Sequence, residues 1–208
     1  MEIHRVSRFS TIGRLFQKFQ KRGCPLRDEW KRVYVALGMR AEFRHYGGSL
    51  SIVPRDDVWA VPVIQGVTID RIMTALLRRG VIICTYVDDF EAAHMNDDRD
   101  SKSDSYVVHF RKTNVADTEL AGLSADDLRT GGIRGITLIE RLLLEAWCCI
   151  VRDDRLDADG SETLCAGSRI SHGRVPYVCR DAKYDRELYI CGAHPGYKDA
   201  RLRARAVI

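Results

Sequence analysis

The spacing of apolar residues predicts a helical region at the start of the chain. The first helix carries an apolar stripe at helix spacing, formed by Phe9, Ile12, Leu15, Phe16 and Phe19. Gly23 and Pro25 end this pattern. A second helix is predicted from Leu26 to about Phe43, with one apolar face made of Trp30, Val33, Tyr34 and Leu37. Gly47-Gly48 then marks the end of a helical N-terminal region, residues 1–48.

The next segment has the pattern of a small β-β-α-β unit, residues 49–104. Two short strands are predicted at Leu50–Val53 and Val58–Ile64. Thr68 is a suitable N-cap for a helix that continues to Arg79. The apolar run Val81–Val87 is typical of a strand buried on both faces. Asp88–Asp104 is polar and acidic, and is therefore predicted as a long loop.

The remaining residues, 105–208, predict short strands packed on one core helix. Tyr106–Phe110 alternates as a strand, and Ser124 begins a short helix. The strongest helix pattern runs from Thr137 to Val151 and is apolar over most of its circumference. Four strands follow, at residues 163–166, 174–179, 187–192 and 202–208. The sequence therefore predicts the α+β class, with short antiparallel strands against this helix.

The C-terminal tract, residues 167–208, combines a sparse apolar frame with residues typical of binding surfaces. It holds four of the eight tyrosines of the chain and no Phe or Trp. Between Tyr177 and Asp199, nearly every position outside the frame is Tyr, Cys, Arg, Asp, Gly, His, Ala or Lys. Such rings, planar donors and small residues are enriched where proteins recognise ligands. Apart from Lys, and from Glu at position 187, the residue types outside the frame all arise by changing the first two bases of a codon such as AAC.

Composition indicates a globular protein of ordinary type. Hydrophobic residues make up 45% of the 208 positions and charged residues 30%. No run of 18 apolar residues suggests a membrane span, and the N-terminus lacks the apolar core of a signal peptide, so we expect a cytoplasmic protein. The seven cysteines form no CxxC pair, so reduced thiols and no structural metal are expected. A bridge between Cys179 and Cys191 stays open as a less favoured alternative.

The net charge of +4 is distributed unevenly along the chain. Residues 1–47 hold eleven Lys/Arg and only four Asp/Glu. Residues 88–127 show the reverse, with four Lys/Arg and eleven Asp/Glu. A basic arm of this kind binds nucleic acid or docks on an acidic segment of its own chain. We favour docking, because the motifs and stacking aromatics of known nucleic-acid modules are missing.

Motifs for catalysis are absent from the sequence. There is no phosphate loop, dinucleotide fingerprint or nucleophile elbow. Asp157-Ala158-Asp159-Gly160 resembles part of a calcium loop, but Arg155 and Ala166 occupy positions that need acidic ligands. Cys191 and His194 could be imagined as a catalytic thiolate and its base, but the sequence supplies no third residue to orient the base. We expect Arg203 and Arg205 to tie loops through carbonyls or carboxylates.

Several segments, taken in order, resemble the variable proteins of diversity-generating retroelements. They are GITLIERLLLEAW, TLCAGSR, VPYV, LYI and LRARAV, together with the earlier NDDRD, SYVVHFRK and LSADDL. The resemblance covers roughly residues 80–208. It implies a C-type lectin-like C-terminal domain whose surface residues are rewritten by adenine-directed mutagenic reverse transcription. It implies no metal, cofactor or catalysis, and the fold name does not imply sugar binding.

The resemblance also implies which residues are fixed and which vary. The fixed frame would be Leu164–Arg169, Val175, Pro176, Val178, Leu188, Ile190, Pro195 and Leu202–Val207. The ligand-binding, hypervariable positions would be Tyr177, Cys179, Arg180, Asp181, Tyr184, Asp185, Tyr189, Cys191, Gly192, His194, Tyr197, Lys198, Asp199 and Ala200. Lys183, Glu187 and Lys198 fit the codon rule poorly. A protein or another macromolecule is the expected ligand.

Two alternatives to a diversified ligand-binding protein stay open. One is an enzyme on the same fold that resembles the formylglycine-generating enzymes and uses Cys179 or Cys191. The other is a nucleic-acid-binding regulator that acts through residues 1–47. If the ligand-binding hypothesis holds, replacing Tyr177, Tyr189 or Tyr197 by Ala leaves stability nearly unchanged, because residues on a free strand face do not hold the core together.

Overall fold

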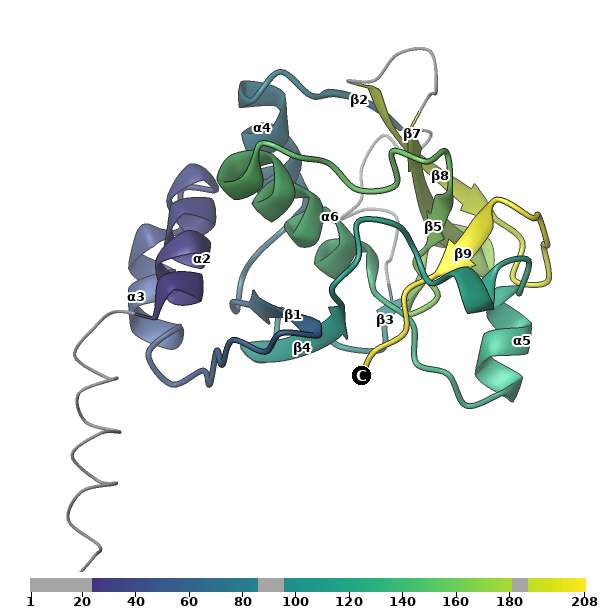
Figure 1. Cartoon of the computed structure of the whole chain (residues 1–208), viewed down its shortest axis with the longest axis horizontal. Helices are drawn as coiled ribbons and strands as arrows, with labels where there is room; N and C mark the ends of the chain where they lie inside the picture. Colours follow the sequence, from purple (N-terminus) through teal and green to yellow (C-terminus); the bar gives the residue numbers. More distant parts are fainter. Residues whose placement is uncertain (1–23, 86–95, 181–186) are drawn as a thin grey trace, which may run out of the picture.

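A computed structural model of the chain describes residues 24–85, 96–180 and 187–208 (Figure 1). The predicted first helix lies outside these residues. The predicted second helix is two helices, α2 (Pro25–Ala36) and α3 (Arg40–Tyr46). Gly38 separates them with a φ of 73°, a left-handed conformation that glycine adopts without steric cost. The single long helix predicted over 26–43 is therefore wrong at this glycine.

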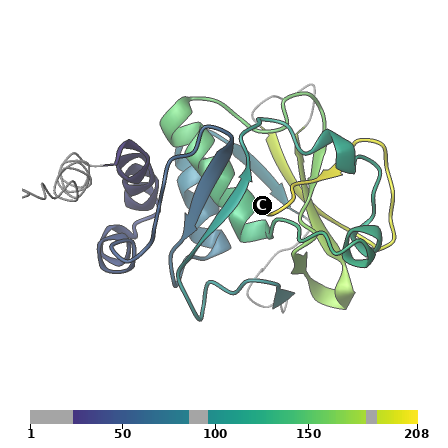
Figure 2. The same cartoon turned by 60° about the horizontal axis from the view of Figure 1, so that its bottom comes forward.

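The main helices begin at the threonines that the sequence predicts. Helix α6 (Leu138–Trp147) has a capping box, in which Thr137 and Glu140 each bond the other's backbone N–H. It continues as a π-helical turn, η2 (Cys148–Arg152). Helix α4 (Ile69–Arg78) begins after Thr68, whose side chain accepts a bond from the backbone N–H of Arg71. Figures 1 and 2 show α6 between the α2–α3 pair and the largest sheet.

Within the described residues, the strands form three sheets. The largest has the order β2-β8-β7-β5-β9. Its strands are β2 (Ile82–Thr85), β8 (Glu187–Ala193), β7 (Val175–Arg180), β5 (Glu162–Leu164) and β9 (Leu202–Ala204). Two antiparallel pairs complete the set: β1 (Val58–Val63) with β4 (Tyr106–Arg111), and β3 (Asn96–Asp97) with β6 (Ser168–Arg169). A short helix, α5 (Ala125–Thr130), begins at Ser124 as predicted.

The structure corrects two strand predictions in the middle segment. Leu50–Val53 forms no strand. The run beginning at Val81 does form a strand, β2, but β2 lies at the edge of the sheet and Ile82 is 51% exposed. Strand β2 pairs in parallel with β8, and β1 pairs with β4, so strands join across the predicted boundary at residue 104. The division into 1–48, 49–104 and 105–208 stays a prediction.

Two hydrophobic clusters hold these elements together. The larger one joins α2, β1, α4 and α6 to the inner face of the large sheet, including Val178, Leu188 and Ile190. The smaller one lies against the other face, near α5, and includes Leu164, Val175 and Leu202. The molecule is therefore α+β, as predicted, and its strands pack against α6. The prediction of antiparallel strands is wrong in part, because β2 pairs with β8 and β5 pairs with β9 in parallel, which makes the large sheet mixed. The C-type lectin-like topology stays a prediction.

A chain of buried charges links α6 to the C-terminal strands. Arg141, fully buried in α6, binds the carboxylates of Glu145 at 2.6 Å and Asp157 at 2.8 Å. Asp157 also binds Arg205 at 2.9 Å. Burial opposes ionisation of Asp157, but the Arg141 and Arg205 guanidinium groups hold its pKa below the usual range. The helix pattern did not predict this network, because Asp157 and Arg205, which pair with one another and join it to Arg141, lie outside the helix in the sequence.

Candidate ligand-binding surface

Strands β7 and β8 separate the predicted frame from the predicted contact residues. Val178, Leu188 and Ile190 point into the larger cluster and are at most 1% exposed. The alternate positions carry Tyr177 and Cys179 on β7, and Tyr189 and Cys191 on β8. All four are partly exposed. The two-residue period of a strand thus places the four side chains together on the outer face.

The register brings these four residues into direct contact across the strands. Tyr177 lies opposite Cys191, and Cys179 lies opposite Tyr189. Strand β2 adds Cys84 opposite Tyr189. We call Tyr177, Cys179, Tyr189 and Cys191 the outer quartet. The sequence predicted its members but gave no sign that Cys84 lies beside it, because a parallel pairing between distant segments leaves no local pattern.

The two ends of the outer quartet differ in exposure. At one end, Tyr177 packs against the smaller hydrophobic cluster. At the other end, Cys179 and Tyr189 line an open cavity of about 560 Å³. Ala200 also lines it, together with residues that the sequence analysis did not single out as ligand contacts: Asp159, Glu162, Arg201 and Arg203. A ligand at this surface would therefore contact two half-buried residues and a charged rim.

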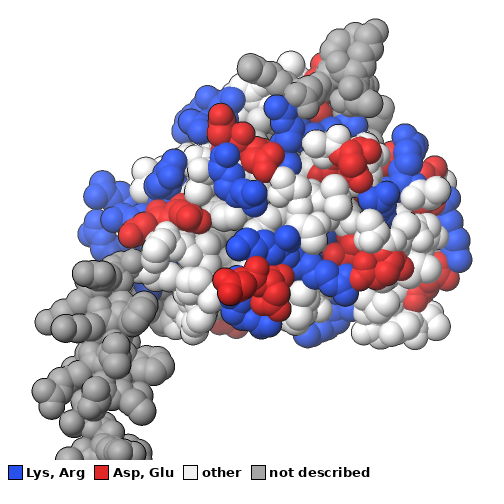
Figure 3. All heavy atoms as spheres, in the orientation of Figure 1, with Lys and Arg blue, Asp and Glu red and all other residues white. Residues whose placement is uncertain are grey.

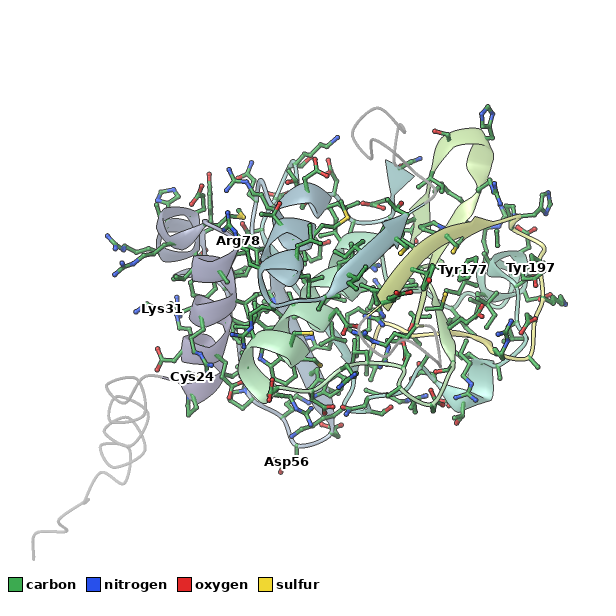
Figure 4. The ribbon with its side chains drawn as sticks, turned by 90° about the horizontal axis from the view of Figure 1, so that it is seen from above. Cys24, Lys31, Asp56, Arg78, Tyr177 and Tyr197 are labelled. Atoms are coloured by element: carbon green, nitrogen blue, oxygen red, sulfur yellow. The ribbon has the colours of Figure 1, made fainter. Side chains whose placement is uncertain are left out.

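The turn after β8 extends the surface with exposed side chains. His194, Lys198 and Ala200 are exposed, and Tyr197 is 47% exposed. The turn is fixed by a bond from the Asp126 N–H to the carbonyl of Pro195 and by an ion pair between Lys198 and Asp127 at 2.8 Å. Figure 4 shows Tyr177 and Tyr197 at the same end of the molecule, opposite α2. Strand β7 and the turn after β8 therefore both present their side chains on a fixed backbone.

Two predicted contact residues are not part of the outer quartet's face. Arg180 reaches the lining of the cavity, but its side chain is only 5% exposed and is held by Glu145 at 2.5 Å. Gly192 lies opposite Pro176, and a Cβ there would be 3.0 Å from Ile170. Each follows an outer residue directly, so strand alternation places it on the opposite face. Asp181, Tyr184 and Asp185 lie outside the described residues.

The thiols of the outer quartet are reduced and hydrogen-bonded. Cys179 and Cys191 are both free. The hydrogen bond from the Cys179 thiol lowers the pKa of Cys191 to about 7, against partial burial, and the Tyr177 hydroxyl also bonds the Cys191 sulfur. The same bond, together with burial, raises the pKa of Cys179. The Nδ1 atom of His194 accepts the N–H of Gly196 at 3.2 Å.

The structure also bears on the roles of Arg203 and Arg205, on metal binding and on membrane-spanning helices. Arg205 donates to the carbonyls of Thr113 and Asn114, and Arg203 binds Asp159 at 2.9 Å, which confirms their structural role. Over residues 24–85, 96–180 and 187–208, no group of three or more His, Cys, Asp or Glu side chains is arranged to hold a metal ion. Within the same ranges, no helix is long and apolar enough to cross a bilayer.

Comparisons with protein-family models, curated proteins and solved structures found no match to this chain.

Proposed function

We propose that the protein is a diversified ligand-binding protein that recognises a macromolecule through the outer quartet and the turn after β8. One observation carries the proposal: neighbouring residues of β7 and β8 divide into a buried frame and an outer set with separate tasks. Residues that contribute little to the core can be replaced at little cost, because large losses of stability come mainly from core changes. Such a division is what a surface needs if its residues are to be rewritten.

The proposed surface is smaller than the sequence alone implied. It consists of the outer quartet, His194, Tyr197, Lys198, Asp199 and Ala200. Arg180 is left out because its nearly buried side chain is paired with Glu145, and Gly192 because it lies on the opposite strand face and a Cβ there would be 3.0 Å from Ile170. Tyrosines supply rigid, amphipathic contact area at low entropic cost, and the charged rim of the 560 Å³ cavity supplies polar contacts. A protein is the ligand that this combination fits best.

Library folding tests the tolerance of the surface. One library randomises Tyr177, Cys179, Tyr189 and Cys191, and a matched library randomises the inner residues Val178, Leu188 and Ile190. We expect most members of the outer library, and few of the inner library, to remain resistant to protease. Equal loss of folded members in both libraries would contradict the proposal.

Sequencing of the DNA beside the gene tests diversification itself. We expect a near-repeat of the last hundred or so bases, differing only where the repeat has adenine, and a reverse-transcriptase gene nearby. If neither is present, the surface is a fixed binding site and the proposed rewriting is wrong.

A second candidate function is nucleic-acid binding through α2 and α3. Their bases Arg27, Lys31, Arg40 and Arg44 line a hollow of about 260 Å³. In the described ranges, no ion pair joins residues 24–47 to the acidic residues 96–127, so the docking favoured by the sequence is not seen there. Figure 3 shows Lys and Arg gathered at the end of the molecule where α2 and α3 lie.

Heparin and DNA retention tests this second candidate. The variant Lys31→Gln/Arg40→Gln/Arg44→Gln removes three exposed charges of the hollow. If the hollow binds phosphates, the variant elutes at lower salt, and the salt dependence of DNA affinity becomes shallower. A matched triple variant at Arg129, Arg174 and Lys198, which are also exposed, controls for net charge. Equal effects of the two variants would exclude a specific site.

The enzyme alternative depends on Cys191, the thiol whose pKa lies near neutrality. A depressed thiol pKa accompanies many reactive cysteines. Alkylation of Cys179 and Cys191 tests this alternative. If alkylation impairs ligand binding but changes no measurable enzymatic turnover, the result counts against catalysis.

A further inference from the structure

Three cysteine thiols gather on the outer face of the largest sheet. Cys179 lies on β7, Cys191 on β8 and Cys84 on β2, and alternation along each strand brings the three to one face. All three are partly exposed and carry free thiols. Cys179 and Cys191 are diagonal neighbours, because Cys179 lies opposite Tyr189 and Cys191 lies opposite Tyr177. Two thiols of adjacent strands therefore lie next to each other within the outer quartet.

These two thiols are in direct contact. A hydrogen bond joins the Cys179 thiol to the Cys191 sulfur, and the Tyr177 hydroxyl bonds the same sulfur. Two donors on one sulfur favour its thiolate form; the charge of Arg174 adds to this effect, and that of Glu162 opposes it. The pKa of Cys191 is therefore lowered to about 7, although partial burial opposes ionisation. The thiolate is the reactive form of a cysteine.

Cys179 stays protonated beside this thiolate. The shared hydrogen bond, together with burial, raises the pKa of Cys179. Cys179 also lines the open cavity of about 560 Å³, so small solutes have access to the pair. Cysteines that sense oxidants have the same arrangement, in which an accessible thiolate lies beside a second thiol that resolves its oxidised form.

We propose that Cys179 and Cys191 form a peroxide-sensitive dithiol that closes reversibly into a disulfide between β7 and β8. The inference goes beyond the proposed ligand-binding function and does not rest on it, because the oxidation needs no macromolecular ligand. It concerns the chain with cysteine at both positions.

The reaction has two steps. The Cys191 thiolate attacks one oxygen of hydrogen peroxide, so an S–O bond forms, the O–O bond breaks and hydroxide leaves. The Cys179 sulfur then attacks the sulfur of the Cys191 sulfenic acid, so the S–S bond forms, the S–O bond breaks and a second hydroxide leaves. The protons of the two thiols convert both hydroxides into water. The two cysteines are thereby oxidised, and one peroxide is reduced to two molecules of water.

Closing the disulfide requires a small movement of the two strands. Diagonal neighbours on antiparallel strands have Cα atoms roughly 7–8 Å apart, whereas the Cα atoms of a disulfide are usually about 4.4–6.8 Å apart. Strands β7 and β8 must therefore draw together at this point, which strains the bond. Strained and exposed disulfides are the labile ones that cellular thiols reduce. We therefore expect glutathione to reopen the bridge.

Peptide mapping of the oxidised full chain tests the proposal. Trypsin places Cys179 in the peptide 175–180 and Cys191 in the peptide 187–198, and neither peptide contains another cysteine. After treatment with hydrogen peroxide and blocking of the remaining thiols, we expect these two peptides to be linked and the intact chain to have lost two hydrogens. The rate should be half-maximal near pH 7, whereas an ordinary thiol needs about pH 8.5. Reduced glutathione should restore both thiols.

Three serine variants separate the roles of the thiols. Cys179→Ser keeps a hydroxyl donor but removes the resolving thiol, so Cys191 should accumulate as a sulfenic acid that dimedone traps. Cys191→Ser removes the thiolate, so Cys179 should stay reduced at pH 7 over the same time. Cys84→Ser, which removes the third thiol of the same face, is the matched control and should bridge at the wild-type rate. Melting temperatures within a few degrees of the wild type show that the variants are folded.

Three results would overturn the proposal. The first is oxidation of Cys191 to the sulfinic acid without a link between the two peptides, which would place Cys179 out of reach. The second is linkage of Cys84 as often as of Cys179, which would mean unselective oxidation. The third is a bridge that reduced glutathione leaves intact, which would mean a structural disulfide.

Discussion

Adjacent residues of β8 should respond in opposite ways to truncation. Ile190 is 1% exposed and packs in the larger cluster, so Ile190→Ala leaves a cavity and should cost about 2–5 kcal/mol of unfolding free energy. Tyr189 lies on the outer face, where its hydroxyl donates to Glu187 at 2.6 Å. Loss of this hydrogen bond and of partly exposed contact area should cost no more than about 1 kcal/mol.

Urea unfolding of the two variants, followed by circular dichroism, measures both values. The tyrosines should form a graded series. Tyr197, 47% exposed, should lose least, and Tyr177 should lose most because it packs against the smaller cluster. This revises the sequence-based expectation that all three are equally replaceable. A loss for Tyr189→Ala as large as that for Ile190→Ala would refute the two-sided arrangement of β7 and β8.

Three further predictions concern charges and thiols. Arg141→Met should destabilise the protein by about 3–5 kcal/mol in urea unfolding, because it removes one of the two arginines that pair with each of the buried carboxylates of Glu145 and Asp157; a neutral effect would mean that the network is not buried. Burial raises the pKa of Asp97 to about 6, above its unfolded value, so folded Asp97 binds more protons and its contribution to stability falls as pH rises from about 4 to 6. A shift of about two pKa units corresponds to roughly 3 kcal/mol, so Asp97→Asn should remove a fall of that order, and an unchanged pH profile would contradict the shift. Iodoacetamide should alkylate Cys191 with a half-maximal rate near pH 7, and Cys179→Ala should move this midpoint upward, because the hydrogen bond from Cys179 is the main cause of the lowered pKa; a midpoint unaffected by that change would exclude the thiol pair.

Local patterns predicted the parts of the fold that depend on neighbouring residues. Thr68 and Thr137 begin helices in the structure because a threonine side chain caps free backbone N–H groups at these positions. The alternation of Val178 with Cys179, and of Ile190 with Cys191, predicted which face of each strand is buried. Both features are fixed by a few consecutive residues, so the sequence displays them directly.

Features that depend on distant contacts were not predictable. The apolar run of β2 indicates a strand but not its place at the sheet edge, because its partner β8 lies about a hundred residues away. The helix pattern of α6 gives no partners for Arg141 and Glu145, because Asp157, Arg180 and Arg205, which complete their buried network, belong to other segments. Arg180 was assigned to the contact surface for the same reason: its partner Glu145 belongs to another element.

Selection for binding tests the central claim most directly. A display library randomised at Tyr177, Cys179, Tyr189, Cys191 and Tyr197 is selected against one fixed protein, lysozyme, which the parent chain is first shown not to bind. The account predicts folded variants that bind lysozyme with micromolar or better affinity. A library that stays folded but yields no binder would contradict it.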